Sequence, residues 1–273
     1  MSNRLKPNVE RVHEMERLPN TVISRRVKPP AQINQGLRDG IECLLEIAAM
    51  ERPLGSRELA RRLGQDHTRV NRIISTLAYM GLAEQTTDRK YVAGPGLLVL
   101  AGLSLRGSPL YRCAMPHLEE LGVVTGYQVA LGLRWRTNVS YLYHGHAREH
   151  AALGIVSEGL YPADRSSIGL VLLSQLTNRE ITELYRGSSA EMLRSPDMKT
   201  LLGRVKEARN AGFAVASNAR SIAVALGKPA VAGIALYRSE DQETLPKDAK
   251  SVRKLVSQLN STAERILKDM ARV

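Results

Sequence analysis

Residues 56–81 read SRELARRLGQDHTRVNRIISTLAYMG, which is two short amphipathic segments on either side of a glycine. Ser56 suits the N-cap of the first segment, and Gly64 suits its left-handed C-terminal stop. Asp66 opens the second segment, whose apolar side chains follow the i, i+3, i+4, i+7 spacing of a helix. These side chains are Val70, Ile73, Ile74 and Leu77. Two helices joined by a tight turn that contains glycine are typical of a helix-turn-helix.

The residues on either side of this stretch complete a small DNA-binding fold. Residues 35–52 carry apolar side chains at helical spacing that we expect to face the core: Leu37, Ile41, Leu44, Leu45 and Ala48. After the stretch, residues 82–85 and 89–92 flank a polar turn and predict a short β-hairpin. Three helices followed by a hairpin predict a winged helix-turn-helix over residues 35–94.

The polar face of the second segment predicts contact with DNA. Opposite the apolar positions it carries the hydrogen-bonding side chains of His67, Thr68, Arg69, Asn71, Arg72 and Thr76. Arginine reads guanine through two hydrogen bonds, asparagine reads adenine, and the threonine methyl group contacts thymine. In a helix-turn-helix the N-terminal end of the second helix enters the major groove, where these side chains would lie. The segment is therefore predicted to be a recognition helix rather than a solvated polar face.

Further places are suited to the DNA backbone. Arg89 and Lys90 lie at the tip of the expected hairpin, where a wing contacts phosphate or the minor groove. Ser56 lies at a helix start, where backbone N–H groups attract phosphate. Residues 1–34 contain four prolines and a basic run, and predict a flexible basic arm that is either a plain tail or a DNA-contacting arm.

Beyond the hairpin the pattern changes twice. Residues 95–107 are mainly apolar and predict a linker helix. In residues 108–273, side chains alternate in polarity on both sides of a turn at Arg136-Thr137-Asn138, and residues 248–270 have one apolar helical face. Mixed strands and helices over this length indicate that the C-terminal part is an α+β domain.

Four stretches resemble the DNA-binding module of IclR-type bacterial regulators. They are GLRDGIECLL at 36–45, LARRLG at 59–64, RIISTLAYMGL at 72–82 and YVAGPGLLVL at 91–100. The resemblance extends, more loosely, to about residue 270. It implies a homodimer or a dimer of dimers that binds a near-palindromic operator through the DNA-binding modules. It also implies that residues 108–273 form a GAF-like antiparallel sheet domain with flanking helices, which senses a small, often acidic, metabolite.

One polar region of that domain is the candidate effector site. If the domain holds a pocket, its rim is expected to carry Ser166, Ser167, Ser217, Asn218 and Arg220. The last of these suits a ligand carboxylate. Asp164 and Leu170 stand where the family commonly has histidine and lysine, and residues 217–220 replace an expected acidic pair. These departures favour either an unusual effector or none.

The predicted function is therefore a sequence-specific transcriptional regulator controlled by a small metabolite, either an organic acid or an aromatic compound. The alternative is a DNA-binding regulator or architectural protein whose C-terminal domain only dimerises and binds no effector.

Composition and charge limit the class of protein and the cellular compartment that can be expected. The 273 residues carry 39 Lys plus Arg against 27 Asp plus Glu, and this excess of +12 is spread along the chain. No apolar run reaches the length of a membrane span, and the first residues lack a secretory signal. Cys43 and Cys113 form no CxxC pair, which suits a reducing compartment. A cytoplasmic bacterial protein with no membrane partner is expected.

Neither catalysis nor a cofactor is predicted. The chain has no GxGxxG, no GxxxxGK[ST] and no GxSxG, and Cys113 has no adjacent histidine. The one histidine cluster is His144, His146 and His150, with Glu149 as the nearby acidic residue. Because other zinc ligands are missing nearby, we interpret these histidines as exposed residues at a strand end and predict no metal site.

Overall fold

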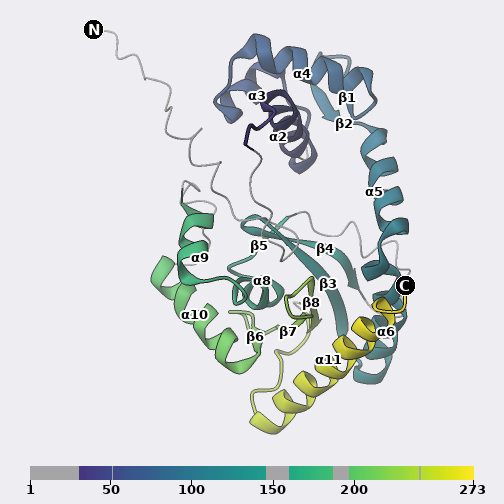
Figure 1. The fold of residues 1–273 in the computed structure, drawn as a ribbon, viewed down its shortest axis with the longest axis vertical. Coiled ribbons are helices and arrows are strands. Elements are labelled where there is room, and N and C mark those ends of the chain that lie inside the picture. Colours follow the sequence, from purple (N-terminus) through teal and green to yellow (C-terminus); the bar gives the residue numbers. More distant parts are fainter. Residues whose placement is uncertain (1–30, 51, 146–159, 187–196, 240) are drawn as a thin grey trace. The chain divides into compact units, whose positions relative to one another are not determined.

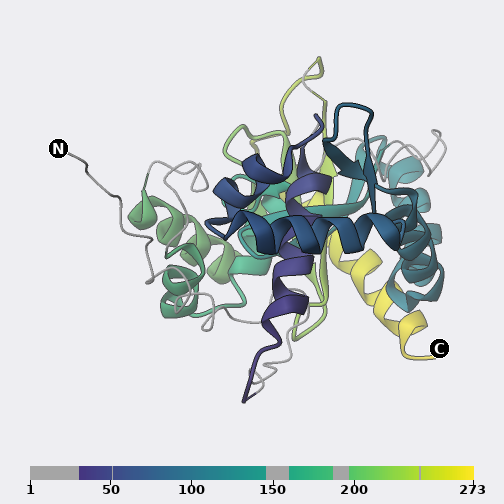
Figure 2. The same ribbon diagram turned by 90° about the horizontal axis from the view of Figure 1, so that it is seen from above.

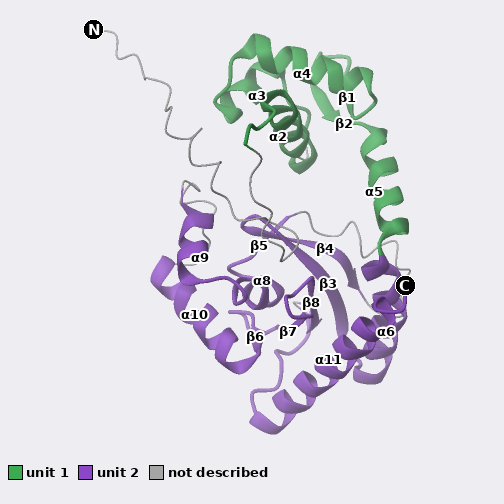
Figure 3. Ribbon diagram, viewed as in Figure 1, with its two compact units in different colours: residues 1–9, 28–108 green, residues 10–27, 109–273 purple. Residues whose placement is uncertain are grey.

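The computed structural model describes residues 31–50, 52–145, 160–186, 197–239 and 241–273 (Figure 1). Almost all of the arm predicted for residues 1–34 lies outside these ranges. The described part divides after Ser108 into two compact units, coloured separately in Figure 3.

Unit 1 is a three-helix core with a two-stranded hairpin and one further helix. Its elements are α2 (Gln35–Ala49), α3 (Ser56–Leu63), α4 (His67–Tyr79), β1 (Ala83–Gln85), β2 (Tyr91–Ala93) and α5 (Pro95–Gly107). β1 and β2 are antiparallel, with Glu84 opposite Val92. Side chains from the three core helices and the hairpin share one small core, which includes Cys43, Leu59 and Ile74. This arrangement is a winged helix-turn-helix, as predicted.

The turn between α3 and α4 is set by two residues. Gly64 ends α3 with a φ of 64°, in the left-handed region that glycine adopts most readily. The side chain of Asp66 then accepts the backbone N–H of Arg69 at 3.0 Å and caps α4. The prediction that Ser56 caps α3 is wrong, because Gly55 is the N-cap. Leu54 pairs with Tyr91 in a β-bridge, which keeps the chain extended up to that glycine.

Helix α2 buries a different face from the one predicted. Asp39, Cys43 and Ile47 face the core, whereas Leu37 is 64% exposed and Ile41 is 45% exposed. The helix has apolar side chains on both faces, so apolar spacing alone did not identify the inner one. The predicted stripe that begins at Leu37 and ends at Ala48 therefore faces largely outward in the single chain.

Unit 2 is built on one antiparallel sheet of six strands in the order β5-β4-β3-β8-β7-β6. The strands are β3 (Gln128–Trp135), β4 (Asn138–Gly145), β5 (Tyr161–Pro162), β6 (Phe213–Val215), β7 (Ser221–Leu226) and β8 (Ala232–Tyr237). The helices are α6 (Pro109–Thr125), α8 (Ser167–Leu173), α9 (Asn178–Tyr185), α10 (Met198–Ala211) and α11 (Ala249–Met270). Thr177 and Glu180 form a capping box that opens α9. The side chain of Asp197 caps α10.

Helices cover both faces of this sheet (Figures 1 and 2). On one face α8, α9 and α10 pack on Ala130, Val139 and Ala223. On the other face α6 and α11 pack on Leu131 and on apolar side chains of β7 and β8. Alternating residues of β3, β7 and β8 thus serve two separate cores. The predicted α+β class is confirmed: an antiparallel sheet with flanking helices follows the winged helix-turn-helix along the chain.

Helix α8 is packed unusually close to the segment before it. All seven of its residues are buried. A Cβ atom added to Gly169 would lie 2.0 Å from the main-chain oxygen of Ala163, so only glycine fits. This contact fixes the start of α8, where Ser166 and Ser167 lie.

Candidate nucleic-acid interface and ligand cavity

The outward face of α4 carries the side chains predicted to contact DNA. Val70, Ile74 and Leu77 are buried beneath that face. The six predicted residues are all exposed: His67, Thr68, Arg69, Asn71, Arg72 and Thr76. Within the described part of the chain the guanidinium of Arg72 has no partner, because only its main-chain oxygen is engaged, by the hydroxyl of Thr76 at 2.9 Å.

Three of the predicted residues are held by neighbours. The Ser56 hydroxyl and His67 Nε2 lie 3.1 Å apart, which joins the start of α3 to the start of α4. Arg69 forms an ion pair with the buried carboxylate of Asp39 on α2. The structure therefore gives Arg69 a partner inside the protein that the helical pattern did not predict.

The wing is also partly paired. Arg89 adopts a φ of 59° at the hairpin turn and is exposed. Lys90 Nζ lies 2.7 Å from a carboxylate oxygen of Asp88. Hydrogen bonds from Lys90 and Thr86 lower the pKa of that carboxyl group. Of the two predicted wing residues, Arg89 is therefore the more available to DNA.

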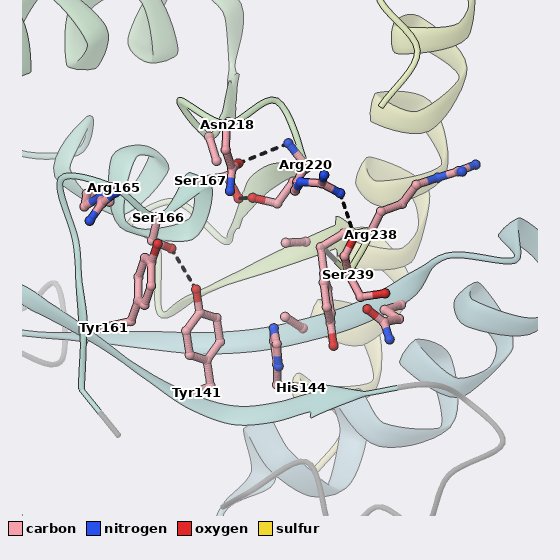
Figure 4. A pocket seen from close by; sticks show the side chains of 16 residues that line it. Tyr141, His144, Tyr161, Arg165, Ser166, Ser167, Asn218, Arg220, Arg238 and Ser239 are labelled. Carbon is pink, nitrogen blue, oxygen red and sulfur yellow. Dashed lines mark hydrogen bonds between the residues drawn. The ribbon is translucent and has the colours of Figure 1, made fainter. Parts of the chain in front are cut away.

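Unit 2 contains a cavity of about 410 Å³ beside the start of α8 (Figure 4). Its walls come from β3, β4, β5, the residues that begin α8, the 216–221 turn and the end of β8. The lining residues are Gln128, Ala130, Tyr141, His144, Tyr161, Arg165, Ser166, Ser167, Ala216, Asn218, Arg220, Ser221, Ala235, Tyr237, Arg238 and Ser239. Of these described residues none is acidic and three are arginines, so the cavity suits an anion.

Four of the five predicted effector residues line this cavity, and Ser217 does not. The Ser166 hydroxyl accepts the N–H of Gly169 at 3.2 Å and lies 3.0 Å from the Tyr141 hydroxyl. The hydroxyls of Ser167 and Ser221 lie 2.8 Å apart. Both predicted serines are therefore held in place by other parts of the wall.

Arg220, the residue expected to pair with a ligand carboxylate, has another role in the structure. Its Nη1 donates to the main-chain oxygens of Ser239 and Gln242, both at 2.6 Å. It thereby ties the 216–221 turn to the segment after β8. Arg238 lies over the ring of Tyr127, 4.7 Å from its centroid. Its side chain extends away from the cavity in Figure 4.

Arg165 is the lining cation that stays available. It is exposed, and its guanidinium contacts no hydrogen-bond acceptor or carboxylate within the described residues. It lies next to Tyr161 at one end of the cavity (Figure 4). Arg165 was not among the predicted rim residues, although its position immediately before Ser166 was a signal for it.

Aromatic rings form a second wall. His144 stacks on Tyr237 with ring centroids 4.0 Å apart and an angle of 7° between the rings, and Tyr141 lies 5.0 Å from the same histidine. Burial lowers the pKa of His144 to about 4, so its imidazole is neutral at pH 7. The prediction that His144 is an exposed strand-end histidine is wrong, because its ring packs between β4 and β8. His146, Glu149 and His150 lie outside the described residues.

The described residues contain neither a candidate metal centre nor a candidate membrane-spanning helix. No group of three or more His, Cys, Asp or Glu side chains there could hold a metal ion. No helix in that part of the chain combines the length and the apolar character that crossing a bilayer requires.

Residues 41–87 match the family model of the IclR helix-turn-helix domain. Curated proteins give no significant match. Among solved structures, an IclR family transcriptional regulator from Brucella abortus has a TM-score of 0.72 and 22% identity, covering 87% of this chain and 93% of that chain. A putative IclR regulator from Silicibacter sp. TM1040 has a TM-score of 0.69 and 20% identity, with 86% and 96% covered.

A third similar structure contains a ligand. It is an IclR homolog from Microbacterium hydrocarbonoxydans complexed with 4-hydroxybenzoate, with a TM-score of 0.59, 20% identity, and coverage of 88% of this chain and 100% of that chain. The fold is therefore a winged helix-turn-helix followed by a sheet domain, as in these solved structures. The family prediction is confirmed: the chain carries the IclR helix-turn-helix domain and has the fold of IclR-family transcriptional regulators.

Proposed function

We propose that this chain is a sequence-specific regulator of transcription that reads its operator with α4. The observation that carries the proposal is the exposed polar face of that helix, where Thr68, Asn71 and Arg72 lie opposite the buried Val70 and Ile74. These side chains match the donors and acceptors of the major groove. Ser56 and the wing residues Arg89 and Lys90 lie at positions suited to backbone phosphates.

The regulator is proposed to act as a dimer or a dimer of dimers. Helix α5 has no buried residue in the single chain, and Leu98, Val99 and Leu103 on it are 77%, 61% and 60% exposed. The outward stripe of α2 adds Leu37 and Ile41. Apolar area of this kind is removed from water when two copies associate. A two-fold dimer would place two recognition helices on half-sites separated by whole turns of DNA.

The cavity of unit 2 is proposed to bind a small organic acid or aromatic effector. Its aromatic wall suits a planar ring, and Arg165 suits a carboxylate at one end. Ser166, Ser167 and Asn218 would supply orienting hydrogen bonds from the opposite wall. The 4-hydroxybenzoate bound by the Microbacterium homolog is a ligand of this chemistry. Effector binding is proposed to shift DNA affinity through α5 and α6 by about 1–3 kcal/mol.

A second candidate function has one observation in its favour. Arg220, Arg238 and the cavity serines already bond to other parts of unit 2. A wall whose polar groups satisfy one another needs no ligand, as expected if unit 2 only dimerises. Thermal unfolding with aromatic and aliphatic carboxylates separates these functions, since a ligand that binds only the folded form raises the melting temperature.

Selection from a pool of random duplexes tests the DNA-binding function. The full chain is expected to enrich one near-palindromic sequence over successive rounds. Arg72→Ala, which removes a guanidinium that has no partner among the described residues, is expected to enrich that sequence more weakly. Recovery of an unbiased pool by the unaltered chain would refute the proposed function. On this proposal the protein works in the bacterial cytoplasm, binds DNA rather than substrate, and has neither catalytic residues nor a metal cofactor.

A further inference from the structure

The ion pair between α2 and α4 gives the DNA-binding face a feature that its residue types do not predict. Asp39 belongs to the buried face of α2, and its side chain is only 3% exposed. Its carboxylate meets Arg69, which comes from the first turn of α4 and whose side chain is 49% exposed. The pair therefore joins a buried anion to a cation at the protein surface.

The energetics of such a pair indicate what it contributes. A carboxylate taken out of water loses several kcal/mol of hydration, and a well-packed apolar side chain in its place is often neutral or stabilising. Packing of α2 on α4 therefore does not require Asp39. What the carboxylate does supply is a fixed position for the guanidinium of Arg69, a side chain that otherwise has about 2 kcal/mol of rotamer entropy to lose on binding.

The carboxylate of Asp39 contacts Arg69 more closely than it contacts the neighbouring Arg38. Arg38 Nε lies 3.6 Å from its Oδ1, and this oxygen has no hydrogen bond. The other oxygen, Oδ2, contacts Arg69 Nη2. Arginine has five N–H donors in a planar fork, so a guanidinium held through one nitrogen retains donors for a second acceptor. Because half of the Arg69 side chain is exposed, an acceptor from outside the protein can reach it.

The position of Arg69 around α4 decides which acceptor that would be. Successive residues of a helix are turned by about 100°, so Thr68 and Arg72 share the face opposite Val70, while Arg69 lies on the flank between these two faces. A helix of about 10–12 Å diameter fills a major groove about 12 Å wide. Its outermost face then meets the base edges, and its flank meets the groove wall, which consists of backbone phosphates.

Resting on the proposed function, we infer that Asp39 is a positioning residue that holds Arg69 ready to bind a backbone phosphate. Arg69 then anchors the start of the recognition helix and carries no sequence preference. Arg72, which has no partner in the described chain, reads the bases. Two arginines three residues apart on one helix thus have different roles because only one of them has a buried carboxylate beside it.

Fluorescence anisotropy on two duplexes tests this division. One duplex is the sequence enriched by the unaltered chain, and the other is a random sequence of the same length, each titrated over a range of salt concentrations. The variants of the full chain are Arg69→Met, its matched control Arg72→Met, Asp39→Asn, and the double variant Asp39→Asn with Arg69→Met. Circular dichroism verifies that each variant is folded.

Arg69→Met is expected to weaken binding to both duplexes by a similar factor of about ten. It should also lower the slope of log K against log salt by about 0.9 for each copy of α4 on the DNA, the value for one phosphate contact. Arg72→Met is expected to lose at least tenfold on the enriched duplex and much less on the random one. Asp39→Asn should weaken both duplexes by about threefold, and it should cause no further loss when Arg69 is already methionine.

Tighter DNA binding by Asp39→Asn overturns the inference. This variant makes the DNA-binding surface more positive by one charge, so it must tighten binding to both duplexes if the position of Arg69 is unimportant. Loss of sequence preference in Arg69→Met, or an unchanged salt slope, also overturns it.

If Asp39→Asn is unfolded, Arg69→Lys takes its place. This variant keeps the charge without the planar fork, so it should bind both duplexes less tightly than the unaltered chain. Equal affinity of the two proteins contradicts the inference. A chain that enriches no sequence refutes the proposed function, while the salt slope on the random duplex still tests Arg69.

Discussion

The two candidate sites are built in opposite ways. The DNA-binding face of unit 1 lies on one helix, α4, and its members are neighbours in sequence. The cavity of unit 2 draws its walls from segments as far apart as Gln128 and Ser239, brought together by the pairing of β3 with β4 and β8. A site on one helix depends mainly on spacing, whereas a site between strands depends on register.

Each site contains both arginines that have partners inside the protein and an arginine that has none among the described residues. On α4, Arg72 has no side-chain partner among the described residues, while Arg69 is paired with Asp39. Around the cavity, Arg220 and Arg238 serve other parts of unit 2, and Arg165 is left for a ligand. In both sites the residue type shows that a cation is present, but only its partners show whether it is available.

The largest expected effect is a loss of stability that is confined to unit 2. Gly169→Ala places a Cβ against the backbone of Ala163, which cannot move aside as a flexible side chain can, so we expect unit 2 to lose about 3 kcal/mol or more of unfolding free energy. Urea unfolding followed by the fluorescence of Trp135, the single tryptophan, measures this unit. Gly203→Ala is the control, since its Cβ meets nothing within 4 Å in α10. Equal stability of the two variants would contradict the described packing of α8.

A second prediction concerns only unit 1. Arg72→Ala removes a free guanidinium from the outward face of α4, and we expect a loss of about 10–100-fold in affinity for the enriched duplex, or about 1–3 kcal/mol. Its melting temperature should not change, because the side chain has no partner within the described chain. Ser75→Ala on the same helix is the control and should cost little. Undiminished affinity in Arg72→Ala would show that α4 does not read the operator.

Substitution of Arg220 is expected to affect the stability of unit 2, whereas substitution of Arg165 is expected to affect ligand binding. Arg220→Met removes two hydrogen bonds to main-chain oxygens and should lower the unfolding free energy of unit 2 by about 1–3 kcal/mol. Arg165→Met should leave that free energy unchanged but remove the rise in melting temperature caused by a carboxylate ligand. Urea unfolding and thermal shift measure the two effects. The assignment fails if Arg165→Met proves the more destabilising change.

At pH 7 the smallest effect is that of His144, because it develops only as the pH falls. The pKa of His144 is about 4 in the folded chain, below its ordinary value of 6.5, so the unfolded state takes up the proton first as the pH falls. Stability contributed by the neutral ring is therefore complete above pH 6.5 and is lost toward pH 4, by about 1.4 kcal/mol per pH unit. In His144→Asn this part of the pH dependence should be absent from urea unfolding. Parallel profiles for the two proteins would contradict the burial of His144.

Much of the fold could be predicted because local patterns determine it. The buried spacing of Val70, Ile74 and Leu77 and the left-handed glycine at 64 both appear in the structure as expected. The buried face of α2 could not be predicted, because that helix has apolar side chains on both sides and its inner face also carries the charged side chain of Asp39.

Less of the cavity could be predicted. Four of five rim residues were found, since they cluster in two short polar segments before α8 and β7. Tyr141, His144 and Tyr237 were missed because their common side of the sheet follows from the register of β3 with its two neighbours. The internal partners of Arg220 lie 19 and 22 residues away in sequence, beyond the reach of any local pattern.

One titration tests the central claim most directly. The full chain is titrated with the DNA upstream of its own gene and with a scrambled duplex of the same composition, at two salt concentrations. We predict a preference for the upstream duplex that persists at the higher salt, since base contacts on α4 do not depend on released counterions. Equal binding to both duplexes, lost in parallel as salt rises, would contradict the claim that this chain reads a DNA sequence.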